Sequence, residues 1–494
     1  MARTIAEILG FLRTLAPVAR LVVPERLRPV AVRGVTLDSR EVRPGDLFAG
    51  LPGARVHGAD RADDAWEAGA VALLSDRPSP LLPSLVVPDP RRVLGPLASW
   101  LHDDPSRAVA VHGVTGTNGK TSTVHLLDAA LTAAGRRTGL AGSLVVRAGD
   151  DERPAGRTTA EAPAVQAMLA RCRDAGVDDV ALEVSSHGLA LHRVAGTRFR
   201  TAVFTNLSPD HLDLHGDLES YYAAKASLFT PERADAAVVV VDDEAGRRLA
   251  AETTCPVTTV STTGVPADWR AGTIRADGDG TSFRARGPGV DVEVRLQLLG
   301  PQQVPNALAA LATAVGAGAD PAAAVRGLAA TPALPGRLER VDAGQPFLAV
   351  VDFAHNVGAH RRVLPFLRSV TAGRLVVVLG ATGGRDRSKR AALGRCVAGL
   401  ADLVVVTDES PHDEDPAALR DAVAAGAREV AGAEVVVHAD RRTAVAVAVA
   451  EAGPGDTVLL AGRGADGVRI EAGVAEPLDD RELLRTALRP RVAG

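Results

Sequence analysis

A glycine-rich turn between a short apolar run and a helical segment constrains the fold of this chain more than any other feature. The turn reads Gly116-Thr117-Asn118-Gly119-Lys120-Thr121-Ser122 and follows residues 109–114. Glycines let successive backbone N–H groups face an anion, and the helix N-terminus adds partial positive charge. The lysine can reach the β- and γ-phosphates, and the threonine hydroxyl can bind Mg²⁺. We therefore predict an ATP-binding domain on a parallel sheet, although Val114 stands where the strict pattern has glycine.

The composition excludes several other classes of protein. Of the 494 residues, 46 % are hydrophobic and 23 % charged, which is typical of a soluble globular protein. A net charge of −4 and an aromatic content of 3 % argue against a nucleic-acid-binding surface. No run of 18 apolar residues predicts a membrane span, and three cysteines are too few for a disulfide framework. We expect a cytoplasmic protein with neither nucleic-acid nor membrane partners.

Lysine is rare in this chain. Of 56 basic residues only Lys120, Lys225 and Lys389 are lysines. Lysine is a compact charge that can act as a free amine, whereas arginine is a planar fork that stays protonated. A lysine retained in such a chain indicates a position where arginine chemistry fails. Lys120 and Lys225 lie in strong motifs, whereas chance remains an open alternative for Lys389.

The order of apolar runs predicts an α/β protein of three domains. We place a small N-terminal α/β domain at 1–100, a central P-loop parallel-sheet ATPase domain at 101–335 and a Rossmann-like doubly wound domain at 336–494. The first domain has apolar runs at 30–35, 70–74 and 85–87, and five prolines between 78 and 90 suit its end. The predicted central elements are strands at 179–184, 201–205 and 236–241, a polar β-like stretch at 273–299 and a helix at 304–315. The predicted C-terminal elements are strands at 348–351, 375–379, 403–406, 434–437 and 457–460, and a helix at 444–450, although its alanine–valine alternation also fits a strand.

Polar side chains follow two neighbouring predicted strands of the central domain. Glu183 ends the first strand, and Asp210 and His211 follow the second. The carboxyl ends of parallel strands meet at one edge, so these groups should face the phosphate loop. Oxygen ligands with a single imidazole suit Mg²⁺ or Mn²⁺. His192 and His215 fit packing roles equally well.

These motifs resemble those of the Mur ligase family, which phosphorylates a carboxylate with ATP and lets an amine attack the acyl phosphate. The resemblance rests on the turn and on segments 183–191 and 221–229, and it covers nearly the whole chain. It implies that Thr121 and Glu183 bind one Mg²⁺, while His211 and a carbamylated Lys225 bind a second. Lys120, Glu183, His211 and Lys225 would be the catalytic residues.

The MurE-type members of this family, which extend a UDP-linked sugar peptide by one amino acid, resemble the chain in segments 35–48, 158–163 and 334–342. The resemblance implies that the UDP portion contacts Leu37 and Ser39. It further implies that the sugar peptide contacts Thr158, Thr159, Ser185 and Arg193. Besides the turn, the nucleotide would contact Asn306, Arg337 and Asp352.

The departures from the MurE-type pattern lie where the incoming amino acid should bind. Members that add meso-diaminopimelate carry Asp-Asn-Pro-Arg, whereas this chain has Glu409-Ser410-Pro411-His412. An imidazole cannot grip a distal carboxylate through two parallel N–H groups as arginine does. Arg385, matching the arginine for the α-carboxylate, is kept, and Glu409 and Asp466 can hold an α-ammonium. The predicted amino-acid site is Arg385, Glu409, Ser410, His412, Gly462 and Asp466.

Other departures leave the carboxylate substrate open. Leu191 replaces a sugar-peptide glutamine, and residues 352–358 read Asp-Phe-Ala-His-Asn-Val-Gly where Asp-Tyr-Ala-His-Thr-Pro-Asp is usual. We expect an ATP-dependent, Mg²⁺-dependent monomeric ligase acting on UDP-N-acetylmuramoyl-L-Ala-D-Glu and a free amino acid. The alternatives are a ligase for a related acid in a specialised pathway and a nucleotide-binding homologue that no longer ligates.

Overall fold

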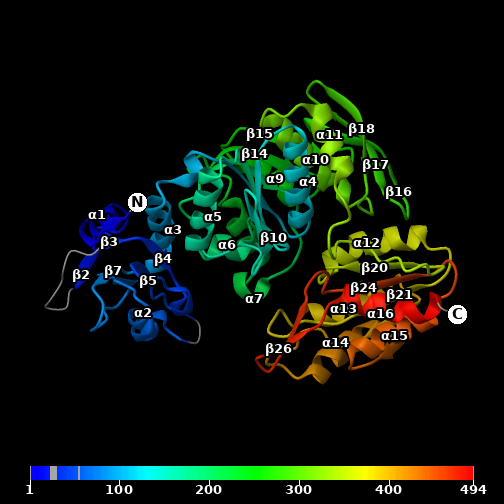
Figure 1. The fold of residues 1–494 in the computed structure, drawn as a ribbon. Coiled ribbons are helices and arrows are strands. Elements are labelled where there is room, and N and C mark those ends of the chain that lie inside the picture. The colour runs from blue at the N-terminus through cyan, green and yellow to red at the C-terminus, as the bar shows by residue number, and fades with distance from the viewer. Residues whose placement is uncertain (1, 23–30, 54–55, 493–494) are drawn as a thin grey trace.

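Three large sheets follow one another along the chain in this computed structural model, which describes residues 2–22, 31–53 and 56–492. Figure 1 shows the N-terminal domain (blue) at one end and the C-terminal domain (yellow to red) at the other, with the large central sheet between them. The predicted α/β class and the three-domain architecture are confirmed.

The N-terminal domain is a five-stranded sheet covered by helices. In spatial order its strands are β2 (Arg20–Val22), β7 (Ser84–Val86), β6 (Ala72–Ser75), β5 (Asp46–Ala49) and β4 (Gly34–Thr36), and β1 (Arg3–Thr4) pairs with β3 (Ala31–Val32) apart from it. Its helices are α1 (Ile5–Leu15), α2 (Ala62–Glu67) and α3 (Pro90–Leu101), with short 3₁₀ turns at Ser39–Glu41, Gly58–Arg61 and, before the central sheet, Pro105–Arg107. Strands β3 and β4 account for most of the predicted run 30–35, and residue 30 lies outside the described residues.

The proline-rich stretch 78–90 does not end this domain. Strand β7 lies within it and pairs with β6 and β2, and Pro90 is the first residue of α3. Proline is tolerated there because the first turn of a helix has no partner for that N–H. The stretch therefore carries an inner strand of the N-terminal sheet, and the sequence-based interpretation of a break was wrong.

The central domain is built on one eleven-stranded sheet. Its spatial order is β11 (Asp151–Pro154), β10 (Val145–Ala148), β9 (Thr138–Ala141), β12 (Asp179–Glu183), β8 (Ala110–Thr115), β13 (Phe199–Phe204), β14 (Ala234–Val240), β15 (Val257–Ser261), β16 (Trp269–Ala276), β17 (Thr281–Gly287) and β18 (Val290–Leu296). Strands β9 to β16 in this order run parallel, and antiparallel strands complete both edges. The predicted β-like stretch 273–299 is therefore an extension of the same sheet.

Helices cover both faces of the central sheet. One face packs against α4 (Lys120–Ala133), α10 (Gln303–Gly316) and α11 (Pro321–Ala330). The other packs against α5 (Ala162–Asp174), α6 (Ser186–Ala190), α8 (Leu218–Ala226) and α9 (Glu244–Glu252), while α7 (Leu212–His215) lies between β13 and α8. This arrangement leaves the carboxyl edge of β8, β12 and β13 open for a ligand.

The C-terminal domain is a doubly wound sheet, as predicted. Its spatial order is β19 (Glu339–Arg340), β20 (Leu348–Asp352), β24 (Thr457–Ala461), β21 (Leu375–Leu379), β22 (Leu403–Val406) and β23 (Glu434–Val437). Helices α12 (Val357–Val370), α13 (Lys389–Ala398) and α14 (Pro416–Arg428) cover one face, and α15 (Arg441–Glu451) and α16 (Asp480–Val492) cover the other. A hairpin of β25 (Val468–Glu471) and β26 (Val474–Pro477) follows β24.

The alanine–valine run 444–450 is helical, as we predicted. Asp440 caps α15 by accepting from the Thr443 N–H, and the buried residues Ala444, Val445, Ala448 and Val449 recur at helical spacing. Alternation along the sequence therefore did not produce a strand. In the described part of the chain, every helix is too short or too polar to cross a membrane.

Candidate active site

A cavity of about 780 Å³ lies between the carboxyl edge of the central sheet and the C-terminal domain. It brings together most of the residues that the sequence singled out. The predicted site residues that line it are Thr117, Asn118, Gly119, Lys120, Thr121, Ser122, Thr158, Thr159, Glu183, Ser185, Arg193, His211, Asn306, Arg337, Asp352, Arg385, Glu409, Ser410, His412, Gly462 and Asp466. Gly116, Lys225, Leu37 and Ser39 are not among the lining residues, and the last two belong to the N-terminal domain.

The backbone of the phosphate loop requires glycine at two positions. Gly116 has φ 151°, and a Cβ there would lie 1.9 Å from Thr205 Oγ1. Gly119, with φ 90°, immediately precedes α4, and its Cβ would lie 2.2 Å from Asn306 Oδ1. Side chains cannot be accommodated in either place. The loop is therefore held open toward the cavity by close packing on β13 and α10.

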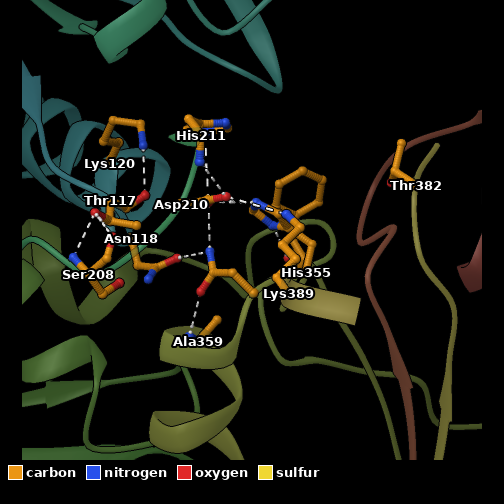
Figure 2. A network of polar contacts seen from close by, with 12 residues as sticks. Thr117, Asn118, Lys120, Ser208, Asp210, His211, His355, Ala359, Thr382 and Lys389 are labelled. Atoms are coloured by element: carbon orange, nitrogen blue, oxygen red, sulfur yellow. Dashed lines mark hydrogen bonds and ion pairs between the residues drawn. The ribbon is translucent and has the colours of Figure 1, made fainter. Parts of the chain in front are cut away.

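The phosphate loop is hydrogen-bonded to the segment that follows β13. Thr117 Oγ1 accepts from the Ser208 N–H at 3.0 Å, and the Asn118 N–H donates to Asn206 Oδ1 at 3.1 Å. Lys120 Nζ donates to the carbonyls of Gly116 and Thr117, both at 2.9 Å. Figure 2 shows Lys120 curled over the loop, with Ser208 on the other side of Thr117. The loop and residues 206–211 thus form one polar unit.

Glu183 and Thr121 both line the cavity beside the phosphate loop with side-chain oxygen atoms. Glu183 is fully buried at the end of β12, where its carboxylate accepts from the Ser143 N–H at 2.7 Å and from Ser143 Oγ at 3.2 Å. Thr121 Oγ1 accepts from Arg337 Nη2 at 3.0 Å. Arg337 belongs to the segment leading into the C-terminal domain, so this bond joins the two domains beside the loop.

The two other predicted nucleotide residues are also fixed by short polar contacts. Asn306 Nδ2 donates to the Gln302 carbonyl and to Gln303 Oε1, each at 3.1 Å. Asp352, at the end of β20, accepts from the N–H groups of Leu338 and Ala354 at 2.7 and 2.8 Å. Burial raises the pKa of Asp352, although nearby Arg337 opposes that shift.

Lys225 lies beneath the phosphate loop with only 1 % of its surface exposed. Its Nζ donates to the Gly116 carbonyl at 2.8 Å and lies 4.5 Å from the centre of the Tyr221 ring. Burial, together with the nearby charge of Lys120, holds the pKa of the Lys225 ammonium well below its usual range. Both effects favour loss of the proton from the Lys225 ammonium, directly under the loop.

His211 stands at the cavity wall in a ring contact with His187, whose centre is 4.7 Å away. His215 contacts the same His187 ring at 6.1 Å, and neither His215 nor His192 is among the cavity-lining residues. Burial lowers the pKa of His211 to about 3, so the imidazole is neutral and can act as a metal ligand. His211 has φ 55°, a left-handed conformation that turns the chain sharply into α7.

The far end of the cavity carries the predicted amino-acid residues. Glu409, after β22, accepts from Thr382 Oγ1 at 2.5 Å, and a side chain at Gly462 would approach Glu409 Oε2 within 2.6 Å. Burial raises the pKa of Asp466, with the charge of Arg463 opposing it. Arg385 lines the cavity from the segment between β21 and α13. One guanidinium and two carboxyl groups thus face a common space, which suits the two charged ends of an amino acid.

Ser410 and His412 are positioned by buried and backbone contacts. The buried Arg463 donates to Ser410 Oγ at 3.1 Å and to the Leu478 carbonyl at 2.9 Å. The His412 N–H donates to the Ile470 carbonyl at 2.9 Å, and its carbonyl accepts from the Ala472 N–H at 2.7 Å. The hairpin β25–β26 is therefore attached to the loop that carries His412. This attachment brings the apolar residues Val468 and Ile470 to the cavity wall.

The predicted sugar-peptide residues lie toward the N-terminal domain. Thr159 Oγ1 donates to the Glu183 carbonyl at 2.8 Å and accepts from the Ser185 N–H at 3.0 Å. Arg193 Nε lies 2.9 Å from Glu161, which also faces Arg91 of α3 at 3.2 Å. These residues form the side of the cavity that is connected to the N-terminal domain.

Several residues of the cavity were not singled out as site residues from the sequence. Ser143 orients Glu183, and the side chains of His355, Asn356 and Lys389 converge on Asp210. The rarity of lysine pointed to Lys389, but its partner lies in another domain and 179 positions away. Sequence spacing gave no means of pairing them.

Family models and relatives agree on what this chain resembles. The Mur ligase middle domain matches residues 114–314, the Mur ligase glutamate ligase domain matches 336–464, and the Mur ligase family catalytic domain matches 31–99. The chain belongs to the Mur ligase family. It is 48 % identical over 472 residues to the UDP-N-acetylmuramoyl-L-alanyl-D-glutamate--2,6-diaminopimelate ligase of Streptomyces avermitilis, covering 93 % of each chain.

Two further comparisons agree with this assignment. A UDP-N-acetylmuramyl-tripeptide synthetase of Leifsonia xyli is 42 % identical, with 93 % of this chain and 92 % of the relative covered. A solved UDP-N-acetylmuramoyl-L-alanyl-D-glutamate--2,6-diaminopimelate ligase covers 100 % of both chains at 28 % identity, with a TM-score of 0.65. Together these Mur ligase matches identify an ATP-dependent ligase of the MurE type, as the sequence predicted.

Proposed function

We propose that this Mur ligase joins a carboxylate of UDP-N-acetylmuramoyl-L-Ala-D-Glu to the amine of an amino acid during peptidoglycan precursor synthesis. The observation that supports it is a single cavity with a phosphate loop at one end and paired acidic and basic groups at the other. The relative from Streptomyces avermitilis carries this substrate in its name, and the relative from Leifsonia xyli is named as a UDP-N-acetylmuramyl-tripeptide synthetase. The retained Lys120, Glu183, His211 and Lys225 argue against a homologue that no longer ligates.

The donor set fits Mg²⁺. Within residues 2–22, 31–53 and 56–492 no three His, Cys, Asp or Glu side chains are grouped so as to hold a metal ion by themselves. Thr121 with Glu183, and His211 with Lys225, instead offer few protein ligands on two sides of the phosphate loop. Mg²⁺ prefers such sites because it keeps waters and binds substrate phosphates. Bound there, it would neutralise negative charge on the transferred phosphoryl group.

Lys225 would serve this site after modification. Its neutral amine can add CO₂ with loss of one proton, and the resulting carbamate would present oxygen atoms near the phosphate loop. Arginine stays protonated and cannot do this. The lowered pKa of Lys225 supports the proposal because only the unprotonated amine is nucleophilic.

The proposed reaction has two bond-forming steps. A substrate carboxylate oxygen attacks the γ-phosphorus of ATP, ADP leaves, and Lys120 stabilises the charge that develops on the transferred group. The ammonium of the amino acid, oriented by Arg385, Glu409 and Asp466, gives up a proton to become a nucleophilic amine. The amine attacks the acyl carbon, phosphate leaves, and the nitrogen releases a second proton as the amide forms. The C-terminal domain covers the cavity and limits hydrolysis of the acyl phosphate.

The amino-acid end favours a second candidate within the same chemistry. His412 stands where arginine holds the distal carboxylate of diaminopimelate in MurE-type members, and Leu191 replaces a sugar-peptide glutamine. Both changes fit a ligase of a specialised pathway with a related carboxylate substrate and a different amino acid. The matches to MurE-type relatives cover nearly the whole of both chains. This coverage favours UDP-N-acetylmuramoyl-L-Ala-D-Glu, the muropeptide, as the carboxylate substrate.

The remaining features of the proposal concern the assembled protein. We place domain boundaries near residues 100 and 335, between the three family matches. We propose that the enzyme acts as a monomer. We place the enzyme in the cytoplasm, where ATP is available, with Leu37 and Ser39 contacting the UDP portion.

An isotope experiment tests the acyl-phosphate route. The muropeptide is labelled with ¹⁸O in the carboxylate to be joined and incubated with ATP, Mg²⁺ and amino acids. We expect one ¹⁸O atom in each released phosphate, because the oxygen that attacks phosphorus leaves with it. Phosphate without the label would rule out carboxylate phosphorylation. A reaction that continues after Mg²⁺ is removed with EDTA would rule out the metal.

A further inference from the structure

Side chains from two separate segments of the C-terminal domain contact the carboxylate of Asp210 in the central domain. Its side chain is 2 % exposed. Oδ2 accepts from Asn356 Nδ2 at 2.9 Å and lies 3.2 Å from His355 Nε2, while Oδ1 lies 3.4 Å from Lys389 Nζ. Figure 2 shows His355 and Lys389 approaching Asp210 from the same side, opposite Lys120 and Thr117. His355 and Asn356 follow β20, whereas Lys389 begins α13.

Asn356 connects this contact to the phosphate loop. The same Nδ2 that donates to Asp210 lies 3.4 Å from Asn118 Oδ1, so the two amide hydrogens serve two central-domain acceptors. Asn356 Oδ1 accepts from the Ala359 N–H at 2.8 Å and caps α12. The start of α12 is thereby fixed against both Asp210 and the loop.

Asp210 is itself part of the polar unit formed with the phosphate loop. Ser208 is bonded to Thr117 through both its N–H and its carbonyl, and Asn206 holds Asn118. Any change in the distance between Asp210 and the C-terminal domain therefore changes the distance between the phosphate loop and the amino-acid residues. Arg337, bonded to Thr121, is a second connection beside the loop.

We propose that Asp210 and Lys389 are positioning residues that dock the C-terminal domain on the phosphate loop. Their contact sets the separation between the acyl phosphate formed at one end and the amine held at the other. This inference rests on the proposed ligase reaction. The buried Asp210 carboxylate has an ammonium and an amide N–H of another domain as partners. Leaving such a carboxylate without partners costs free energy, which favours the docked arrangement.

Loss of the contact between Asp210 and Lys389 should uncouple ATP consumption from ligation. If the amine is held too far from the acyl carbon, water competes for the acyl phosphate, and ATP is used without a product. A displacement of about 1 Å can slow such a step by about 10²-fold. A variant that is merely unstable loses ATP use and product formation together, so the ratio of the two separates the cases.

The experiment measures ADP formed per ligated product for Asp210→Asn, Lys389→Met and the double variant. We expect a ratio near one for the wild type and a clear excess of ADP in each single variant, larger in Asp210→Asn because that change also disturbs the contacts with His355 and Asn356. The double variant should show no more excess ADP than Asp210→Asn alone. Lys389→Arg should restore most of the coupling. Arg395→Met is the matched control, since Arg395 lies on the same helix, is half-exposed and pairs with Glu429 of its own domain.

Small-angle scattering supplies a readout that does not depend on the reaction. We expect a larger radius of gyration for Asp210→Asn and Lys389→Met than for the wild type and Arg395→Met. Unchanged coupling in the single variants, or an unchanged radius, would overturn the docking role. If the wild type ligates nothing, the proposed function fails, and the scattering comparison still decides whether these residues dock the domain.

Discussion

At the nucleotide end of the cavity the functional groups lie within a few residues of strand ends, whereas at the amino-acid end they lie on loops and a hairpin. Glu183 is the last residue of β12 and the phosphate loop directly follows β8. His412 is carried by a loop after β22 that is attached to β25, and Val468 of that hairpin is 47 % exposed. One end is set by the sheet, and the other by segments that can vary in length and sequence.

The difference suggests that the nucleotide end carries out the reaction and the amino-acid end selects the amino acid. Lys225 and Glu183 are buried at the nucleotide end, and both match the MurE-type pattern. The amino-acid end keeps groups for the α-carboxylate and α-ammonium, yet its side-chain pocket departs at His412. We therefore expect changes at the nucleotide end to act on kcat and changes at the amino-acid end to act on the choice and KM of the amino acid.

The largest expected effect is at Lys225. Lys225→Arg should lower kcat for ligation by about 10²- to 10³-fold, the size typical of losing one preorganised charge-stabilising group. The guanidinium cannot form a carbamate. Ligation rates and nucleotide binding are measured in parallel, with Glu219→Gln as control because Glu219 lies on the same helix and pairs with the exposed Arg248. Full activity in Lys225→Arg would show that ligation does not need a carbamate at this position.

A smaller effect is expected from His412→Arg. An arginine there would restore two parallel N–H donors, and kcat/KM for meso-diaminopimelate should rise by about tenfold relative to other amino acids. Competition between amino acids, read by product mass, gives the preference directly. If the preference does not change, His412 does not face the side chain of the incoming amino acid.

The smallest expected effect is a pH dependence at Asp466. Burial raises the pKa of this carboxyl, so it is protonated at a higher pH than a free aspartate as the pH falls. The protonated form cannot hold an ammonium group, and KM for the amino acid should therefore rise severalfold on acidification. Asp466→Asn should have a high KM that no longer changes in that range. A wild-type KM that is constant with pH would show that Asp466 does not bind the amine.

Sequence patterns were most informative where one local rule determines the structure. Strands β21, β22 and β23 begin and end at the predicted residues. For β21 and β22 the reason is that each is a short apolar run buried on both faces. The phosphate loop was recognisable because its glycines, lysine and threonine are adjacent in sequence. Its packing against Thr205 and Asn306 depends on residues far along the chain and could not be predicted.

The contacts between domains were beyond the reach of sequence patterns. Asp210 and Lys389 each belong to a recognisable segment, but nothing in either segment indicates the other. The antiparallel extension β16–β18 illustrates the same limit, since its polar alternation predicted strands but not the sheet that they join. Likewise β7 is an inner strand among prolines, because its pairing with β6 and β2 outweighs the local breaks.

The most direct test of the central claim is the mass of the product formed from UDP-N-acetylmuramoyl-L-Ala-D-Glu, ATP and a panel of free amino acids. The account predicts a muropeptide heavier by one amino-acid residue, with one ADP formed per product, and the mass identifies the residue added. No ligated product with any amino acid, while ATP binding is intact, would contradict the muropeptide as substrate.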